Sequence, residues 1–239
     1  MARPRKDISK PTPPPAGKGS AMARDRNGAD LDARKIPSAV IKRLSLYARI
    51  LQLLEFEKVE KVSSAELARR LGLNSAQVRK DLACFGQFGI PGFGYHVGEL
   101  RRELRRILGK DREVRVVLVG VGNLGSALLS YRGFLKQGFT MLWGFDDNPE
   151  AARARSRSSI VIYDVEELET RLEGQHVDIA VLAVPDEVVQ DIANRLVRLG
   201  IHAFLNFVPT RLEVPADVHV RYVDLSLELE SLSFYVQDD

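Results

Sequence analysis

A glycine-rich turn between an apolar strand and a helix is the feature that most constrains how this chain can fold. The apolar run 114–119 predicts a buried strand, and a helical pattern begins directly after the turn. The turn itself reads Gly120-Val121-Gly122-Asn123-Leu124-Gly125. In this context Gly-x-Gly-x-x-Gly is typical of dinucleotide binding, because the first glycine permits a tight turn, the second admits a pyrophosphate and the third lets helix and strand pack closely. We therefore predict that the residues of this turn bind a dinucleotide.

The second half of the chain alternates strands with helices, which indicates a doubly wound parallel sheet of Rossmann type in an α/β fold. We expect strands over 114–119, 141–145, 177–184 and 201–207, helices over 123–136 and 186–199, and a short strand over 219–223 before a last helix from Asp224. The segment 151–160 is ambiguous, because it fits either a loop or a helix that leads into a short strand over 160–163.

An acidic residue follows the second predicted strand. Asp146 comes 21 residues after Gly125, where a carboxylate accepts hydrogen bonds from the adenosine ribose and repels a 2′-phosphate. The sequence therefore favours NAD(H) over NADP(H). The adjacent Asp147 is an alternative ribose ligand, and helix capping is the alternative role for either carboxylate. The ends of later strands meet the same edge of the sheet and add three candidate ligands: Val184, Pro185 and Phe207.

Residues suited to hydride-transfer catalysis are harder to find, although dinucleotide binding usually indicates a dehydrogenase. His176 and His202 lie at the starts of their predicted strands, whereas ligands bind at the carboxyl ends, and His96 and His219 lie in other regions. Asp186 follows a strand end, but a helix N-cap is the simpler interpretation. We therefore predict no catalytic residue and binding without turnover, with an NAD-dependent oxidoreductase as the second hypothesis.

The first half of the chain predicts short helices in a helix-turn-helix arrangement. Apolar residues recur at steps of three and four over 40–54, which indicates an amphipathic helix. Ser63 and Glu66 have capping-box spacing at the start of a short helix that Gly72 can end. The segment Asn74-Ser-Ala-Gln77 repeats this capping pattern before a third helix that runs to about residue 85.

Glycines alternate with apolar residues over 85–95, as a twisted two-stranded hairpin requires. We therefore expect the wing of a winged helix in this segment, with Gly92 and Gly94 as candidate contacts to DNA. A basic helix over about 97–108 follows the wing, and residues 110–113 are the predicted linker.

Charge is distributed unevenly between the two halves. Residues 35–110 hold 15 Lys and Arg against 7 Asp and Glu, a net charge of +8, whereas residues 111–239 hold 12 against 21, a net charge of −9. A basic first half indicates that this half contacts a polyanion. The candidate contacts to DNA bases and phosphates are Ser63, Ser64, Gln77, Arg79 and Lys80.

These patterns divide the chain into four predicted segments. They are a disordered basic tail over 1–33, a winged-helix domain over 34–110, a Rossmann domain over 111–216, and a C-terminal strand and helix over 217–239. Since the chain has no apolar run of bilayer length and no signal-peptide pattern, we expect a cytoplasmic protein without a membrane partner. A single cysteine, Cys84, excludes a Cys-based metal cluster, so we expect no metal and a cysteine packed as a small apolar group.

The chain resembles the Rex family of redox-sensing transcriptional repressors, which respond to the balance of NADH and NAD+. The resemblance covers residues 35 to about 236. It rests on blocks in the right order: Lys35-Ile-Pro-Ser38, Gln77-Val-Arg-Lys-Asp-Leu82, Gly92-Phe-Gly-Tyr95, Gly120 to Gly125, Leu205-Asn-Phe-Val-Pro209, Val223-Asp224-Leu225 and Leu232-Ser-Phe234. It implies a repressor of palindromic operator DNA that is not an enzyme, with NAD(H) as effector. It also adds Lys35 and Ser38 to the candidate DNA contacts and Tyr131 to the candidate cofactor ligands.

The resemblance further implies a homodimer. The last helix, over about 224–236, would be exchanged between subunits and would pack between the two domains of the partner. Bound NADH would then lock an arrangement that cannot bind DNA, through contacts of Arg49, Tyr131 and Asp224 that rearrange between the two states.

The chain departs from the family pattern at three places. Ala83-Cys84 stands where the family commonly has Ser-Tyr, residues 156–160 lack the usual glycine-rich turn, and Leu225 stands where some members have Phe. Recognition-helix contacts and packing near the nicotinamide are therefore expected to differ. Two alternatives stay open: coenzyme A in place of the dinucleotide, and nonspecific nucleoid binding, which would show no preferred sequence.

Overall fold

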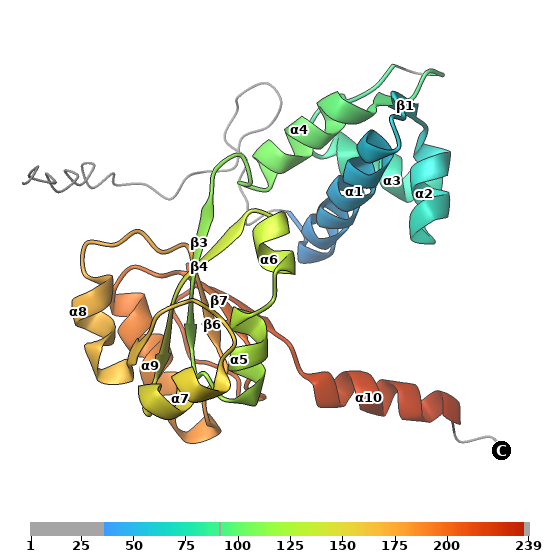
Figure 1. Ribbon diagram of the computed structural model, residues 1–239. Helices are drawn as coiled ribbons and strands as arrows, with labels where there is room; N and C mark the ends of the chain where they lie inside the picture. Colours follow the sequence, from blue (N-terminus) through green and yellow to red (C-terminus); the bar gives the residue numbers. More distant parts are fainter. Residues whose placement is uncertain (1–35, 91, 237–239) are drawn as a thin grey trace, which may run out of the picture.

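The computed structural model describes residues 36–90 and 92–236, which form a helical N-terminal part, a six-stranded sheet with helices, and a protruding last helix (Figure 1). The tail predicted over 1–33 and the candidate contact Lys35 lie outside the described residues. No helix among the described residues is both long enough and apolar enough to span a bilayer.

The N-terminal part contains the helices that the sequence predicts. Its elements are α1 (Ser38–Phe56), β1 (Lys61–Val62), α2 (Ser64–Leu71), α3 (Ser75–Ala83), β2 (Tyr95–His96) and α4 (Val97–Ile107). The apolar stripe of α1, which includes Leu44, Tyr47 and Leu51, is buried and packs with Leu100 and Leu104 of α4. Helix formation here follows from burial of one amphipathic face on another.

The caps of the helix-turn-helix form largely as predicted. Ser63 Oγ accepts a 3.0 Å hydrogen bond from the N–H of Glu66, and Gly72 ends α2 in the left-handed conformation with a φ of 64°. Asn74 Oδ1 caps α3 by accepting from the N–H of Ala76. The reciprocal half of the capping box does not form, because the Glu66 carboxylate instead accepts hydrogen bonds from arginines on the same helix.

The hairpin predicted over 85–95 does not form as a regular two-stranded ladder. Ile90 and Gly94 make a single antiparallel bridge, and β2 pairs with β1 instead, with Val62 opposite Tyr95. Gly94 has a φ of 79°, and a Cβ there would lie 2.5 Å from the carbonyl oxygen of Val62. This close approach explains why the segment is a glycine-rich loop held against β1 and not a pair of extended strands.

Cys84 is exposed, so the expectation that it packs as a small apolar group is wrong. Helix α3 ends one residue earlier, and Cys84 Sγ donates a 3.4 Å hydrogen bond to the carbonyl oxygen of Lys80.

The C-terminal part is a parallel sheet in the order β5-β4-β3-β6-β7-β8, which is the doubly wound order of a Rossmann fold. Its strands are β3 (Val114–Val119), β4 (Phe139–Asp146), β5 (Ile162–Asp164), β6 (Ile179–Leu182), β7 (Ala203–Asn206) and β8 (His219–Tyr222). The order reverses between β3 and β6, so their carboxyl ends flank the crevice in which such folds bind ligands.

Helices cover the two faces of the sheet. They are α5 (Asn123–Leu129), α6 (Gly133–Lys136), α7 (Pro149–Arg155), η2 (Val165–Glu167), α8 (Leu168–Leu172) and α9 (Asp186–Arg198). One core joins α8 and α9 to the sheet, and a second core joins α5 and α7 to its other face. The ambiguous segment 151–160 therefore begins as helix, whereas η2 and α8 are elements that the sequence analysis did not identify.

The helix predicted over 123–136 is broken into α5 and α6, so that prediction is wrong in its length. The Ser130 hydroxyl donates to the carbonyl oxygen of Ser126, and the Tyr131 ring lies against Gly133, where a Cβ would be 2.3 Å from a ring carbon. A hydroxyl that bonds the backbone and a glycine both weaken a helix interior.

The linker between the two parts is fastened to the sheet. Arg112 donates two hydrogen bonds to the carboxylate of Asp178 at the start of β6, at 2.6 and 3.1 Å, and the N–H of Arg115 donates to the same carboxylate at 2.8 Å. These hydrogen bonds hold the pKa of the Asp178 carboxyl below its ordinary value, against the opposing effect of burial.

The last helix, α10 (Leu225–Ser233), and the short η3 (Phe234–Val236) extend away from the sheet (Figure 1). Asp224 caps α10 by accepting from the N–H groups of Ser226 and Leu227. Large apolar side chains are exposed along the whole segment: Leu225, Leu227, Leu229, Leu232, Phe234, Tyr235 and Val236. An apolar helix left uncovered marks a surface for another molecule or another copy of the chain.

Candidate functional site

The glycine turn after β3 has the geometry that its sequence predicts. Gly120 has a φ of 92°, and a Cβ there would lie 2.3 Å from the carbonyl oxygen of Ala183 at the end of β6. Gly125 is equally restricted, because its Cβ would lie 2.0 Å from the carbonyl oxygen of Gly120. A Cβ at Gly122 would meet no atom within 4 Å, so this position faces open space beside the start of α5. Two glycines are thus needed for packing, and the third leaves room for a ligand to approach the backbone.

Asp146 lies at the end of β4 and is bonded to the glycine turn. Its Oδ2 accepts a 2.6 Å hydrogen bond from the N–H of Val121, and its Oδ1 accepts a 3.0 Å hydrogen bond from the N–H of Asn148. Asn148, not Asp146 or Asp147, caps α7, so the capping alternative is wrong for both aspartates. Asp146 is therefore the carboxylate placed beside the turn, whereas Asp147 is exposed.

Two polar residues that hold backbone groups at this edge of the sheet were not identified from the sequence. Arg155 donates a 2.9 Å hydrogen bond to the carbonyl oxygen of Val121, so both the N–H and the carbonyl of that residue are held. Asn206 is fully buried at the end of β7, where it bonds the N–H of Val208 and the carbonyl oxygen of Thr210. Asn206 stands inside one of the blocks that carry the family resemblance, which is the signal that points to it.

The other predicted ligands lie at strand ends on the same edge of the sheet. Val184 and Pro185 follow β6, and Phe207 follows β7 and donates its N–H to the carbonyl oxygen of Leu182. Asp186 is the first residue of α9 and not its N-cap, and its carboxylate accepts a hydrogen bond from the Thr210 hydroxyl.

Tyr131 is placed differently from the other predicted cofactor ligands. It follows the carboxyl end of α5, whereas the glycine turn precedes the amino end of that helix, so the two lie at opposite ends of α5 within one chain. Tyr131 lines a cavity of about 1100 Å3 together with Arg49 of α1. The cavity lies between the N-terminal part and the sheet and contains four cationic side chains: Arg49, Arg101, Arg132 and Lys136. No described contact joins Asp224 to Arg49 or Tyr131 within one chain.

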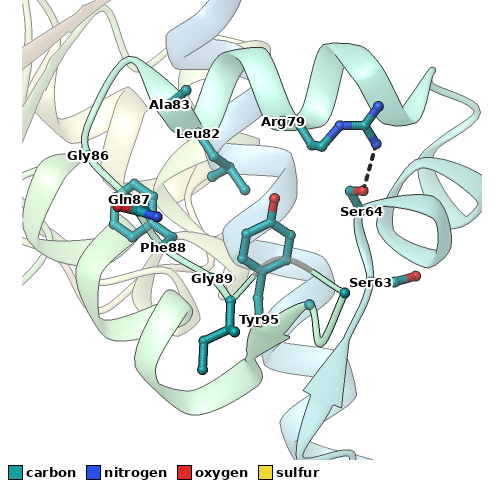
Figure 2. A pocket seen from close by; sticks show the side chains of 13 residues that line it. Ser63, Ser64, Arg79, Leu82, Ala83, Gly86, Gln87, Phe88, Gly89 and Tyr95 are labelled. Atoms are coloured by element: carbon teal, nitrogen blue, oxygen red, sulfur yellow. Dashed lines mark hydrogen bonds between the residues drawn. The ribbon is translucent and has the colours of Figure 1, made fainter.

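The predicted DNA contacts gather at the starts of helices and in the wing segment. A groove of about 490 Å3 runs between α3 and the wing, lined by Ser63, Ser64, Arg79, Gly92 and Gly94 among others. Figure 2 shows the hydrogen bond that Arg79 of α3 donates to the hydroxyl of Ser64 at the start of α2, and the ring of Tyr95 in the groove. The distance between the two atoms is 3.1 Å. Gln77 and Lys80 are on the same helix, whereas Ser38 lies apart at the start of α1.

A buried ionic cluster fixes α3 to α1. Asp81 of α3 is 1% exposed, and its carboxylate accepts hydrogen bonds from Arg43 and from the hydroxyl of Tyr47, both on α1. Burial by itself raises the pKa of Asp81, but these hydrogen bonds, together with one from Gln77, outweigh it and lower the pKa. Burial also raises the pKa of the Tyr47 phenol. The carboxylate is therefore ionised and fully partnered at neutral pH.

Neither the histidines nor the acidic residues form a catalytic or metal-binding cluster in the described part of the chain. His176 contacts Asp178, and His202 contacts Asp217, both at the amino ends of strands and away from the glycine turn. No group of three or more His, Cys, Asp and Glu side chains among the described residues has the spacing for a metal ion.

Two family models match this sequence. A model described as putative DNA-binding protein N-terminus matches residues 35–83, and a model described as CoA binding domain matches residues 111–210. The second match begins in the linker, and residues 84–110, which include the wing segment and α4, lie between the two matches. The first match covers the helix-turn-helix, and the second covers the sheet with its glycine turn.

Relatives of known name match most of the chain. The redox-sensing transcriptional repressor Rex of Carboxydothermus hydrogenoformans is 45% identical over 86% of this chain and 98% of its own length. Among solved structures, RSP, a Rex-family repressor, in complex with β-NAD+ and operator DNA is 38% identical, with a TM-score of 0.77 over 85% of this chain and 93% of that chain. RSP in complex with β-NADH has a TM-score of 0.74 at the same identity, over 85% of this chain and 95% of that chain.

Proposed function

The chain belongs to the Rex family of redox-sensing transcriptional repressors, and from that membership we propose that it represses transcription by binding operator DNA and senses redox state by binding NAD(H). It is a repressor and not an enzyme. The observation that carries the proposal is the match to RSP, whose solved structures contain NAD+ with operator DNA in one case and NADH in the other. A repressor works where the chromosome is, so we place this chain in the cytoplasm.

NAD(H) is proposed to bind at the crevice between the ends of β3 and β6. The pyrophosphate would lie on the N–H groups at the start of α5, beside the open position at Gly122. The Asp146 carboxylate would accept hydrogen bonds from the adenosine ribose. Candidate ligands are the turn residues Gly120 to Gly125 with Asp146, Val184, Pro185 and Phe207. Coenzyme A carries a phosphate on its adenosine ribose, which the Asp146 carboxylate would repel, so the match to a CoA binding domain is better explained by the shared turn and sheet.

DNA is proposed to bind across α3 and the groove beside the wing. The N-terminal residues of a recognition helix contact base edges; here Gln77 lies in the first turn of α3, and Arg79 and Lys80 follow it along the same helix. The hydrogen bond between Arg79 and Ser64 joins α3 to the start of α2, so the recognition helix and α2 present their donors together. Ser38, Ser63, Gly92 and Gly94 are further proposed contacts to the phosphate backbone.

The protein acts as a homodimer, and we propose that α10 is exchanged between subunits. Leu225, Leu229 and Leu232 lie on one side of α10 at helical spacing, while Leu227 lies on the opposite side. A helix that is apolar on two sides needs two covering surfaces. The cavity between the two parts of a partner chain would supply both. The cavity is basic, whereas α10 carries Glu228 and Glu230 and no basic residue.

The cavity also contains a donor that this chain leaves unpartnered. Arg101 Nη2 pairs with Glu55 at 2.8 Å, but Arg101 Nε is buried without a hydrogen-bond partner among the described residues. An acidic helix inserted into the cavity would bring acceptors close to it. Asp224 of one subunit could then approach Arg49 and Tyr131 of the other, and NADH would act by favouring one arrangement of these three residues.

The domain boundaries follow from this assignment. We take residues 34–110 as the DNA-binding domain, 111–216 as the NAD(H)-binding domain and 217–239 as the segment that joins subunits. The two DNA-binding domains of a symmetric dimer would contact the two halves of a palindromic operator.

A titration tests this function directly. Binding of the full-length protein to a palindromic operator would be measured at fixed salt while NADH or NAD+ is added. Release by NADH but not by NAD+ is the expected result. DNA binding that is indifferent to both nucleotides would reject the proposal, and steady NADH oxidation with a substrate would favour the oxidoreductase.

A further inference from the structure

The amide of Gln77 has a fixed orientation, because its neighbour can only accept hydrogen bonds. Gln77 is the third residue of α3, and its side chain is hydrogen-bonded at 2.7 Å to Oδ1 of Asp81, one turn further along the helix. An ionised carboxylate has no donor, so the amide nitrogen of Gln77 must be the atom that faces it. The amide oxygen is consequently directed away from Asp81, and it accepts no hydrogen bond from the described residues.

The carboxylate that sets this orientation is itself held firmly. Asp81 Oδ1 and Oδ2 accept from Nη2 and Nε of Arg43 at 2.8 and 2.5 Å, and Oδ2 also accepts from Tyr47 Oη at 2.7 Å. A bidentate arginine pair in a buried site fixes both position and charge. Because Arg43 and Tyr47 belong to α1, the orientation of the Gln77 amide is tied to the packing of α3 on the rest of the domain.

An oriented glutamine selects among bases in the major groove. An amide oxygen must meet a donor, which adenine and cytosine supply through their amino groups, whereas the groove edge of guanine offers only acceptors. Asp81 uses one N–H of Gln77, and the second N–H remains to bond N7 of adenine beside that amino group. A freely rotating amide could present either end and would discriminate less.

We propose that Asp81 is a positioning residue for operator recognition, which holds the Gln77 amide with its nitrogen inward and its oxygen toward an adenine. This inference rests on the proposed function and extends it to a single base pair in each half-site. Asp81 itself does not touch DNA, since it is 1% exposed; it acts through Gln77.

The test is selection of bound sequences from random DNA by the full-length dimer and its variants. Gln77→Ala should lose the preference for adenine at one position per half-site by about tenfold, the usual scale for a bidentate base contact. Asp81→Asn should lose the same preference at the same position, because an amide at position 81 allows the Gln77 amide to flip. In the Gln77→Ala background, Asp81→Asn should cause no further loss of preference.

Tyr47→Phe is the matched control. It removes one hydrogen bond from the same carboxylate but leaves the contact with Gln77, so the adenine preference should remain. Equal weakening of all sequences by Asp81→Asn, or loss at a position other than that lost by Gln77→Ala, would overturn the positioning role. If the wild-type protein selects no sequence at all, the proposed repressor function fails instead.

A measurement on the wild-type protein does not depend on whether Asp81→Asn folds. Each adenine of the selected operator would be replaced in turn by purine, which lacks the amino group, and by 7-deazaadenine, which lacks N7. At the Gln77 position both replacements should weaken binding about tenfold. Tolerance of both replacements at every position would overturn the proposal.

Discussion

The N–H of Val121 donates a 2.6 Å hydrogen bond to Oδ2 of Asp146, so the glycine turn after β3 is joined directly to the end of β4. One carboxylate thus orients the turn and is available to the ribose. The carbonyl of the same valine accepts from Arg155. The backbone that would meet the pyrophosphate is therefore held on both sides before any nucleotide binds.

Asp146→Asn is expected to weaken NADH binding by about tenfold or more, since hydrogen bonds to charged groups contribute about 1.5–3 kcal/mol. Loss of the negative charge should also reduce the preference for NADH over NADPH. Binding can be followed by energy transfer to NADH from Trp143, the one tryptophan of the chain, which lies in β4. Asp147→Asn is the control, because Asp147 is adjacent and exposed. A larger loss from Asp147→Asn would identify that residue as the ribose ligand.

Gly122→Ala and Gly125→Ala are expected to separate ligand binding from folding. A Cβ at position 122 meets open space and the φ there is −65°, so the unfolding temperature of Gly122→Ala should equal that of the wild-type protein. The same variant should bind NADH about tenfold more weakly, because the added methyl group would occupy the space of the pyrophosphate. A Cβ at position 125 would lie 2.0 Å from the carbonyl oxygen of Gly120, so Gly125→Ala should be destabilised by about 1–3 kcal/mol, as overpacked positions are. Thermal denaturation and calorimetric titration measure the two effects. Full NADH affinity in Gly122→Ala would remove the turn from the binding site.

Leu229→Arg is expected to shift the protein from dimer to monomer and to reduce operator affinity by at least about tenfold, because two half-sites are no longer bound together. Leu229 is 69% exposed in the isolated chain, so the substitution should not disturb the fold of either domain. Sedimentation velocity gives the oligomeric state. Ser226→Arg places the same side chain on the polar side of α10 that also carries Glu230, between the two apolar sides, and should remain dimeric; a dimeric Leu229→Arg would exclude this face from the subunit contact.

The DNA-binding domain is expected to lose stability in acid partly through Asp81. The pKa of this carboxyl is below its ordinary value of 3.8 in the folded protein, so its contribution is complete above pH 3.8 and is lost as the pH falls through the lower, folded-state pKa. For a single such group the slope is at most about 1.4 kcal/mol per pH unit. Thermal unfolding of the wild-type protein between pH 5 and pH 2 should therefore show a steeper decline than that of Asp81→Asn. Equal slopes would mean that folding does not lower the pKa of Asp81.

Periodicity and capping residues were sufficient to predict most helices and strands. The stripe over 40–54, the caps at Ser63 and Asn74, and the glycine turn all depend on contacts within a few residues, which is why they can be predicted locally. The helix α8, with five residues, was missed because so short a helix has too few turns to show a period. The break at Ser130 was missed for the same reason, since α6 beyond it has only four residues.

The wing and the Asp81 cluster show what local patterns cannot predict. Gly94 is fitted against the carbonyl of Val62, which lies 32 positions earlier, so the pairing of β2 with β1 depends on the fold and not on alternation. Arg43 and Tyr47 reach Asp81 from 38 and 34 positions away. The sequence indicates that Gln77 is a suitable base reader, but only the folded arrangement indicates which end of its amide faces outward.

The uncovered apolar sides of α10 also bear on how such a repressor would respond to its own abundance. A newly made chain without a partner displays the kind of surface that chaperones and proteases recognise in unfolded proteins. Because two chains must meet before that surface is hidden, operator occupancy at low expression would rise with the square of the chain concentration. At low concentration the chains would therefore be degraded, whereas at high concentration they would dimerise and persist. Repression would then begin only above a threshold concentration of the chain, and NADH does not set that threshold.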